Sequence, residues 1–250
     1  MSPEVSIITC SLSGKELSRT INSVLAQDFT DYEIVIVAPS DNLQISELQT
    51  KHEIKNKLTI ILDSKAGIYS AMNAGAQAAR GKLLLFLNEG DELSKSSSLN
   101  DLREVSFGKD WAYGSILKRD ISAGTTSVYR FAPYRRILHR FGWRYVPHPS
   151  SIIAKRLFDS LKGFDISERI AADQKLFLQA SQISSPGVTK EIISTFSLGG
   201  SSSRSVREAM HDAKRISNAV FGYVLRSRLL DNVFWKANAK LKAILKHFVS

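Results

Sequence analysis

Two acidic residues follow directly after an apolar run in the first half of the chain. The run spans Leu83 to Leu87, and Glu89 and Asp91 lie in the polar stretch behind it. Carboxylates after a buried strand could hold a divalent cation against phosphate oxygens, because hard cations prefer oxygen ligands and neutralise a diphosphate leaving group. The alternative is an ordinary polar turn of sequence Asn-Glu-Gly-Asp. Taken alone, these residues leave both interpretations open.

Cations are concentrated in two regions of the chain. Residues 204–250 hold ten Lys and Arg against three acids, which accounts for +7 of the net charge of +10. Residues 121–158 contain no acid and seven cations, namely Arg130, Arg135, Arg136, Arg140, Arg144, Lys155 and Arg156. We expect an anionic partner, and charge alone admits nucleic acid, phospholipid head groups or a diphosphate-bearing substrate. A solvated basic loop is the alternative for the second region.

The elements that must position these residues alternate between strand and helix over the first ninety residues. Continuous apolar runs predict buried strands at 5–9, 33–37, 58–62 and 83–87. Helical spacing predicts helices after the capping-box pair Ser13 and Glu16, over 46–57 and over 68–79, the last stopped by Gly81. This alternation indicates an α/β fold with a parallel sheet covered on both faces. Ligands of such sheets bind beyond the carboxyl ends of the strands, so the loops after Thr9 and Leu87 are the places to search.

Beyond residue 94 the pattern changes toward a mixed sheet. We predict strands at 111–117, 125–131 and 188–197 and helices at 150–161 and 170–181. Two amphipathic helices follow a Ser-rich joint. The last one places Phe234, Ala237, Leu241, Ile244, Leu245 and Phe248 on one face, with Lys236, Lys242 and Lys246 largely opposite. That face predicts either packing onto the domain or association with a membrane surface.

Composition fits one globular catalytic domain with a short appendage, since 43% of the residues are hydrophobic and 23% charged. No apolar run approaches the roughly 20 residues that span a bilayer. The first ten residues lack the basic and apolar segments of an export signal, so a cytoplasmic protein is expected. Cys10 is the single cysteine, which we expect to be a small apolar filler.

Several segments, in order, resemble the family 2 glycosyltransferases, the inverting enzymes of GT-A fold found in bacterial polysaccharide clusters. They are VSIIT from Val5, YEIVIV from Tyr32, GIYSAMNAGAQAARG from Gly67, LLFLNEGDEL from Leu84, VPHPSSIIAKRLFDSLKGFDISERIAADQKLFL from Val146 and FSLGGSSSR from Phe196. The resemblance covers about residues 5–204 and is most specific over 67–91. It implies a GT-A domain over residues 1–203, a mixed α/β sheet with flanking helices, and a basic helical extension over 204–250.

The resemblance also implies roles for particular residues. Asp173 would be the catalytic base that deprotonates an acceptor hydroxyl, with Asp165 as a rival that reads more like an Asx turn. Asp91 would bind Mg²⁺ or Mn²⁺ at the diphosphate. The nucleotide-sugar donor would contact Thr9, Asp41, Lys65, Gly67, Met72, Asn73, Asn88 and Glu89. The acceptor or its phosphate would contact His148, Arg144 and Arg204, although a structural histidine is an equal alternative for His148.

This chain departs from the family pattern where the donor should bind. Ala38 and Lys65 stand where the family has aspartates, and Asn88 and Gly90 fill the first and third positions of its metal motif. Lys65 could pair with phosphate instead. The departures leave the nucleotide and the sugar of the donor open.

The leading hypothesis is a cytoplasmic, hexosyltransferase-like enzyme of cell-surface polysaccharide biosynthesis. It would move a sugar to a saccharide or a polyprenyl-diphosphate-linked acceptor, as a peripheral protein at the inner face of an anionic membrane. A degenerate GT-A protein that binds a sugar or a partner without catalysis is the alternative. Nucleic-acid binding is disfavoured, because the Arg-rich region shows no known nucleic-acid motif.

Overall fold

The structure is a computed structural model that describes residues 2–40, 43–50, 54–63, 67–120, 123–168, 170–198, 206–224 and 226–249. Its strands are β1 (Val5–Cys10), β2 (Tyr32–Ala38), β3 (Leu58–Leu62), β4 (Leu83–Phe86), β5 (Glu92–Leu93), β6 (Trp111–Asp120), β7 (Thr125–Tyr129), β8 (Ser151–Ala154) and β9 (Gly187–Leu198). Its helices are α1 (Leu17–Leu25), α2 (Leu43–Thr50), α3 (Ile68–Ala78), α4 (Ser98–Val105), α5 (Arg136–Arg140), the 3₁₀ helix η1 (His148–Ser150), α6 (Lys155–Ser160), α7 (Ala172–Ile183), α8 (Val206–Phe221) and α9 (Arg228–Val249).

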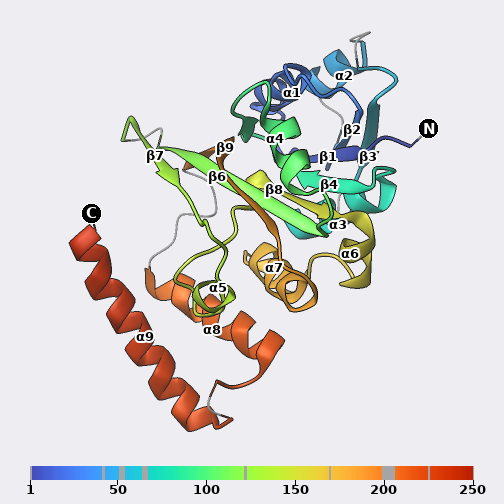
Figure 1. Ribbon diagram of the computed structural model, residues 1–250. Helices are drawn as coiled ribbons and strands as arrows, with labels where there is room; N and C mark the ends of the chain where they lie inside the picture. Colours follow the sequence, from blue (N-terminus) through green and yellow to red (C-terminus); the bar gives the residue numbers. More distant parts are fainter. Residues whose placement is uncertain are drawn as a thin grey trace.

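One mixed sheet runs through the molecule in the order β3-β2-β1-β4-β8-β6-β9-β5, with β7 paired to β6 (Figure 1). The first four strands are parallel, as predicted, and β1 lies between β2 and β4. Strand β8 runs antiparallel between β4 and β6 and joins the two halves. The carboxyl end of β4 therefore faces the region that the second half builds.

Both faces of the parallel half are buried, which explains the continuous apolar runs in its sequence. On β1, Ile8 packs into a cluster with α3 and α7, whereas Ile7 packs into a separate cluster with α1 and α4. On β2, Val35 and Ile36 divide between the clusters in the same way. Alternate side chains of a strand point to opposite faces, so both faces need apolar residues when helices cover both.

The prediction of a helix over residues 150–161 is wrong in its first half. Residues Ser151–Ala154 form β8, and the helix α6 begins only at Lys155. The β-branched pair Ile152 and Ile153 is buried between β4 and β6, and this pairing outweighs the helical spacing that suggested a longer helix. The predicted strands at 111–117 and 125–131 are confirmed as the antiparallel pair β6 and β7.

Two further helix predictions need correction. Ser13 does not cap α1, because that helix begins after Glu16, and the Ser13 hydroxyl donates to Glu89 instead. Of the helix predicted over residues 46–57, the first five residues are helical in α2, residues 51–53 lie outside the described part of the chain, and residues 54–57 form a turn. Tertiary contacts explain both corrections. The Ser13 hydroxyl donates to the distant carboxylate of Glu89, and the side chain of Ile54, in the turn, is buried in the core.

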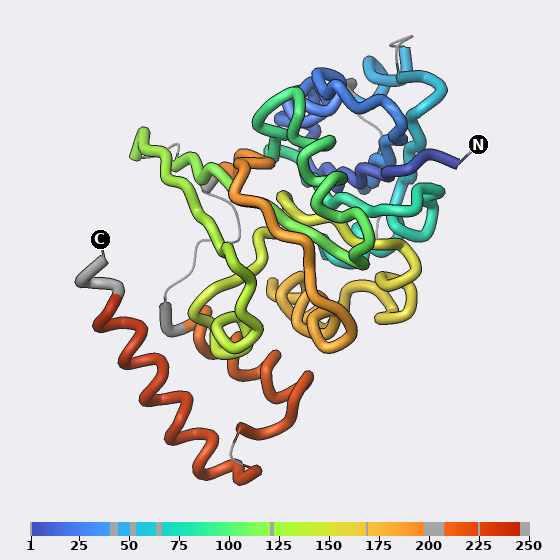
Figure 2. Tube along the Cα trace, viewed as in Figure 1, coloured from blue at the N-terminus to red at the C-terminus, as the bar shows by residue number. Residues whose placement is uncertain are grey.

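The two C-terminal helices form a hairpin at the side of the molecule away from the N-terminus (Figure 2). Helix α8 lies against α7 and α5, and α9 lies outside α8. Of the predicted apolar face of α9, Leu241, Ile244 and Leu245 are exposed, whereas Phe234 packs against Phe141 with ring centres 5.0 Å apart. Packing onto the domain is therefore confirmed at Phe234 and is wrong for the three aliphatic residues.

Candidate active site

A cavity of about 510 Å³ opens where the carboxyl end of β4 meets the second half of the sheet. Helix α3 supplies one wall, β6 and β9 supply another, and the start of α7 closes a third. The loop after β4 contributes Asn88 and Asp91, and α7 contributes Asp173. Residues of the segment 67–91 and of the segment that begins at Val146, both of which carry the family resemblance, thus share one cavity.

Asp173 lies in the first turn of α7, and two neighbours hold its carboxylate. The Tyr69 hydroxyl of α3 donates to the backbone oxygen of Ile170 at 2.6 Å and lies 3.1 Å from Oδ1, while the Gln174 amide donates to Oδ2 at 2.8 Å. Burial, together with the negative charge of Asp173, raises the pKa of Tyr69, so the phenol stays protonated as a donor. Each carboxylate oxygen keeps a second lone pair with which it can accept a proton.

A chain of polar side chains crosses the cavity from the β4 loop to Asp173. Asn88 Nδ2 lies 3.2 Å from His148 Nε2, and His148 Nδ1 lies 3.9 Å from Asp173 Oδ2. Burial lowers the pKa of His148, although Asp173 opposes that effect. A neutral ring in which Nε2 accepts from Asn88 therefore carries its proton on Nδ1, facing Asp173.

A second histidine fixes the amide beside Asp173. His139 Nε2 donates to Gln174 Oε1 at 3.0 Å, and the Tyr134 hydroxyl lies 3.1 Å from His139 Nδ1. Gln174 Oε1 also accepts from the backbone of Val146, which leaves only the amide nitrogen to face Asp173. Burial lowers the pKa of His139 to about 4, so this ring is neutral at physiological pH. The sequence did not single out Gln174, His139 or Tyr69, because each acts through contacts with residues distant in the chain.

The predicted metal ligand Asp91 lines the cavity and is 5% exposed. Burial raises its pKa to about 8, with Arg19 opposing the effect. Nearby, Asn88 Oδ1 is a buried oxygen without a hydrogen-bond partner in the described structure. Two oxygen ligands suit Mg²⁺ or Mn²⁺ when substrate phosphates and waters complete the shell. These residues therefore fit a divalent cation, although the described residues contain no cluster of three metal-binding side chains.

Glu89 lines the cavity and also binds the loop after β1, and its contact with the donor stays a prediction. Its carboxylate accepts five hydrogen bonds from the loop after β1: from the backbone amides of Leu12, Ser13 and Glu16 and the hydroxyls of Ser11 and Ser13. Partial burial alone would raise the pKa of Glu89, but these bonds outweigh it and hold the pKa below its usual value. Glu89 thus ties the β1 loop to the β4 loop.

The other predicted donor residues lie at different depths around the cavity. Met72 lines it from α3, whereas Asn73 forms two hydrogen bonds with the backbone of Phe164, at 2.8 and 2.9 Å. Gly67 precedes α3 with φ at 107°, a conformation that favours glycine. Thr9 is fully buried in β1. Donor contacts of these four residues stay predictions.

Four residues discussed for binding lie outside the cavity lining or outside the described part of the chain. Asp41, Lys65 and Arg204 are not among the described residues. Arg144 is exposed, with its guanidinium 6.0 Å from the centre of the Tyr129 ring. Its role toward an acceptor phosphate stays a prediction.

The rival carboxylate Asp165 is held in a turn, as the sequence suggested. It accepts from the Ser167 amide at 2.9 Å and forms an ion pair with Lys175, and hydrogen bonding to that ammonium lowers the pKa of Asp165 to about 2. A carboxylate so stabilised in its charged form is a weak base. The geometry favours Asp173.

Lys118 is a cavity residue that the sequence analysis missed. Its ammonium lies 4.7 Å from the ring centre of Tyr129 and 5.1 Å from that of Tyr145, and these two rings stack at 4.2 Å. Burial lowers the pKa of Lys118. A cation held on aromatic faces beside a cavity can receive an anionic group. Lys118 directly follows the strand predicted over 111–117, and that position was the available signal.

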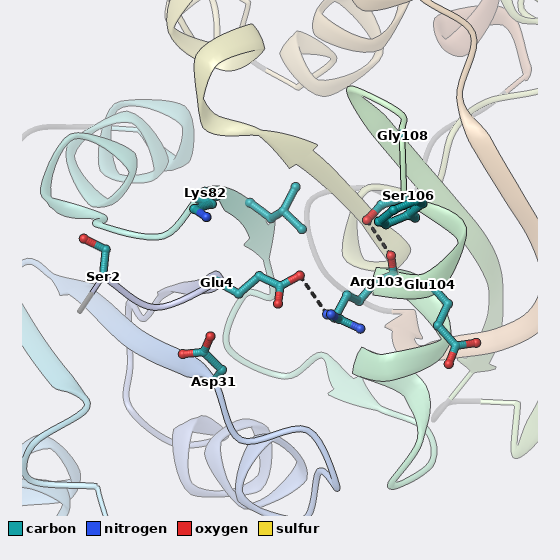
Figure 3. A pocket seen from close by; sticks show the side chains of 10 residues that line it. Ser2, Glu4, Asp31, Lys82, Arg103, Glu104, Ser106 and Gly108 are labelled. Atoms are coloured by element: carbon teal, nitrogen blue, oxygen red, sulfur yellow. Dashed lines mark hydrogen bonds and ion pairs between the residues drawn. The ribbon is translucent and has the colours of Figure 1, made fainter.

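A second hollow, of about 550 Å³, lies at the opposite end of the parallel strands (Figure 3). Its charged side chains include Glu4 and Arg103, which form an ion pair at 2.7 Å. Asp31 and Lys82 lie at its edge (Figure 3). Parallel sheets bind ligands at the carboxyl ends of their strands, so this hollow is at the less favourable end.

Residues 6–162 match the model of glycosyl transferase family 2, and the chain therefore belongs to that family. It is a glycosyltransferase with the mixed sheet of the GT-A fold. It is 27% identical over 241 residues to an uncharacterized glycosyltransferase of Mycobacterium tuberculosis, covering 93% of this chain and 90% of that one. It is 26% identical over 180 residues to a PGL/p-HBAD biosynthesis glycosyltransferase of Mycobacterium bovis, covering 68% of this chain and 67% of that one.

Solved structures show the same fold at low identity. The TarS fragment of S. aureus, in complex with UDP, superposes with a TM-score of 0.67 at 17% identity, over 88% of this chain and 65% of that chain. This chain thus spans slightly less than two thirds of that structure. A mannosyltransferase of Pyrobaculum calidifontis in complex with GDP-Man and Mn²⁺ superposes with a TM-score of 0.65 at 13% identity, over 100% and 76% of the two chains.

Proposed function

We propose that this glycosyltransferase inverts the anomeric configuration while moving a sugar from a nucleotide-sugar donor to a saccharide or polyprenyl-diphosphate-linked acceptor. The observation that carries the proposal is the placement of Asp173 in one cavity with Asn88 and Asp91. A base and a pair of oxygen ligands for a diphosphate-bound cation are the two components that a direct displacement needs.

The chemistry follows from the contacts of Asp173. Its carboxylate takes the proton of an acceptor hydroxyl as that oxygen forms a bond to the anomeric carbon. The bond from this carbon to the diphosphate oxygen breaks at the same time, and its electron pair leaves with the diphosphate. Gln174 donates a hydrogen bond to one carboxylate oxygen, and the Tyr69 hydroxyl, which is shared between Ile170 and Asp173, lies beside the other, so the base is oriented before the acceptor arrives.

Asn88 Oδ1 and Asp91 would hold a divalent cation, which supplies charge neutralisation for the departing diphosphate when it is bound. Lys118 offers a second positive charge from the β6 side of the same cavity. His148 links Asn88 to the neighbourhood of Asp173, so the donor side and the acceptor side share one polar chain.

The structural relatives support a nucleotide-sugar donor without selecting one. Their complexes hold UDP, UDP-GlcNAc or GDP-Man. One relative is named for PGL/p-HBAD biosynthesis, which supports a biosynthetic role for the transfer. We place the reaction in cell-surface polysaccharide assembly, in the cytoplasm at the inner membrane face. Among the described residues, no helix has the length and apolar character to cross a membrane.

A panel of nucleotide sugars with Mg²⁺ or Mn²⁺ tests the proposal, with donor binding and release of nucleoside diphosphate as the two measurements. Asp173→Asn is expected to keep donor binding and to lose at least about 10²-fold in turnover, because it retains the hydrogen-bond acceptor toward Tyr69 but cannot take a proton. Asp159→Asn, an exposed carboxyl on α6, is the matched control. Donor binding without turnover in the unmodified protein would support the non-catalytic alternative, and unchanged turnover in Asp173→Asn would refute the assigned base.

A further inference from the structure

Helix α9 exposes six aliphatic side chains on one side while it buries Asp231 and Asn238 on the other. We propose that its outward face is a docking surface for an anionic lipid bilayer. The proposal deepens and rests on the proposed function, since it assigns the surface by which the enzyme would reach a lipid-linked acceptor. Binding to lipid does not require turnover, so the two can fail separately.

The inward face of α9 is anchored by polar contacts. Asp231 is 1% exposed and accepts from Asn218 and from the backbone amide of Val224, both at 3.0 Å. Asn238 accepts from the Trp143 indole at 2.7 Å and donates to the backbone oxygen of Phe141 at 3.0 Å. These satisfied buried groups fix which side of the helix faces the protein.

Trp235 adds apolar contact to this inward face. It is 4% exposed and packs edge-on against Phe141 at 5.8 Å between ring centres. Lys242, one turn beyond Asn238, donates to the backbone oxygen of Gly142. Rotating α9 to bury its other side would break all of these contacts, so the orientation is well determined.

The outward face consists largely of exposed aliphatic side chains. Leu229 and Val233 are 73% and 60% exposed, and the others are between 40% and 51% exposed. They are Leu230, Leu241, Ile244 and Leu245. At 100° per residue these six positions fall within one half of the helix circumference, where they form one group at each end of the helix. Phe234 shares this half and packs against Phe141 with ring centres 5.0 Å apart. Two groups of exposed aliphatic side chains on one side of a helix are unusual on a protein that has no partner there.

The charges beside this surface select an anionic partner. Lys236 is exposed at the edge of the aliphatic face, Lys240 is exposed within it, and Arg228 is exposed at the start of the helix. Asp231 is the one acidic residue in the sequence from 228 to 250, and it faces inward. A second copy of this chain would bring like charges together across the contact, whereas an anionic bilayer offers both phosphate groups and an apolar layer.

The position of α9 relative to the cavity fits this assignment. Helix α9 packs on α8, and Ala209 of α8 lines the cavity that holds Asp173. Figure 1 shows α9 along the outside of the molecule, with α8 between it and the sheet. The 22 residues of α9 span about 33 Å, so a helix lying flat would offer a long contact with the surface. The docked enzyme would have its cavity one helical layer from the lipid.

Sedimentation with vesicles tests the proposal on the full chain. Vesicles of pure phosphatidylcholine and vesicles with added phosphatidylglycerol provide the neutral and anionic surfaces. We expect binding to the anionic vesicles that weakens as salt rises. Failure to bind them, or equal binding to both kinds of vesicle, would overturn the proposal.

Two double variants separate the contributions of the face. Leu241→Gln with Ile244→Gln keeps helix-forming residues and is expected to reduce the affinity for anionic vesicles by roughly tenfold or more, because it removes apolar contact. Lys236→Gln with Lys240→Gln should reduce it by about thirtyfold at low salt. Unchanged affinity in both would overturn the proposal.

Matched controls lie elsewhere on the surface. Phe107→Gln with Ile183→Gln replaces exposed apolar residues, and Lys109→Gln with Lys190→Gln replaces exposed lysines, so neither pair should alter vesicle binding. Donor turnover measured without lipid should be the same in all of these variants. A dimer in solution that the Leu241 and Ile244 changes dissociate, without vesicle binding, would assign the face to a second copy and overturn the lipid proposal.

Discussion

The replacement Glu89→Gln tests whether this carboxylate organises the donor loops. The carboxylate joins the loop after β4 to the loop after β1 through five hydrogen bonds. Glutamine has the same shape, but one oxygen becomes an NH₂ group. In either orientation that group faces at least one backbone N–H donor: those of Leu12 and Ser13 at Oε2, or that of Glu16 at Oε1.

The magnitude follows from the bonds that cannot survive. One or two backbone hydrogen bonds to a charged acceptor are lost, at about 1.5–3 kcal/mol each, and partial exposure of the side chain keeps the total near the lower end of that range. We expect the free energy of unfolding to fall by about 2–3 kcal/mol, which corresponds to a decrease of about 5–10 °C in melting temperature for a chain of this size. Loosened loops should also raise the KM for the donor.

The pH dependence gives an independent readout. Because the pKa of Glu89 is lower in the folded protein than in the unfolded chain, its contribution is present above the unfolded pKa and is lost as pH falls through the folded pKa. The variant should therefore lose part of the acid-induced destabilisation that the unmodified protein shows below about pH 4.3.

Thermal melts at pH 7 and in acid check this prediction. Glu191→Gln is the matched control, since its carboxylate pairs with Lys95 at the surface and both side chains are about half exposed. It should change stability by less than about 1 kcal/mol. The expected decrease in melting temperature is at least about 5 °C. A melting temperature of Glu89→Gln within about 1 °C of that of the unmodified protein would refute the role of Glu89 in organising the two loops.

Three further predictions concern the cavity and its support. Acidification from pH 7 to pH 5 should lower the free energy of unfolding by about 2 kcal/mol through His139, because the pKa of this histidine is near 6.5 in the unfolded chain and about 4 in the folded protein. Urea unfolding at the two pH values measures this loss, and the loss should be correspondingly smaller in His139→Asn. Lys118→Met should weaken binding of a nucleoside diphosphate about tenfold in calorimetry without lowering the melting temperature, as one charge-assisted contact is lost while the stem remains; equal affinity would remove Lys118 from the anion site. Asp91→Asn should abolish any rise in melting temperature on adding Mn²⁺, whereas the exposed Asp159→Asn should retain it, and a full Mn²⁺ response in Asp91→Asn would contradict the metal assignment.

Much of the parallel half could be predicted from local sequence. Runs such as the one from Glu33 to Val37 are apolar on both strand faces, which few environments other than a sheet covered by helices can satisfy. Gly67 has φ at 107°, a backbone conformation that favours glycine and that depends on this residue alone. The placement of Asp91 and Asp173 at one cavity rested on the family resemblance, because no local pattern brings residues so far apart together.

The missed features depend on contacts between distant segments. Residues 151–154 became a strand because β4 and β6 leave a gap that these residues fill. Ser13 lost its capping role because Glu89, 76 residues away in the chain, accepts from its hydroxyl. Lys118 gained its position from the stacked rings of Tyr129 and Tyr145.

The sequence by itself determined the class of fold, the family and the residue types available for the reaction. Tertiary structure decided what surrounds each carboxylate: Asp173 lines the cavity, Glu89 accepts hydrogen bonds from the loop after β1, and Asp165 forms an ion pair with Lys175. It also decided that the aliphatic side of α9 faces outward. The physical reason is the same in both cases, since local spacing fixes which side chains share a face, while only packing against distant segments determines what that face meets.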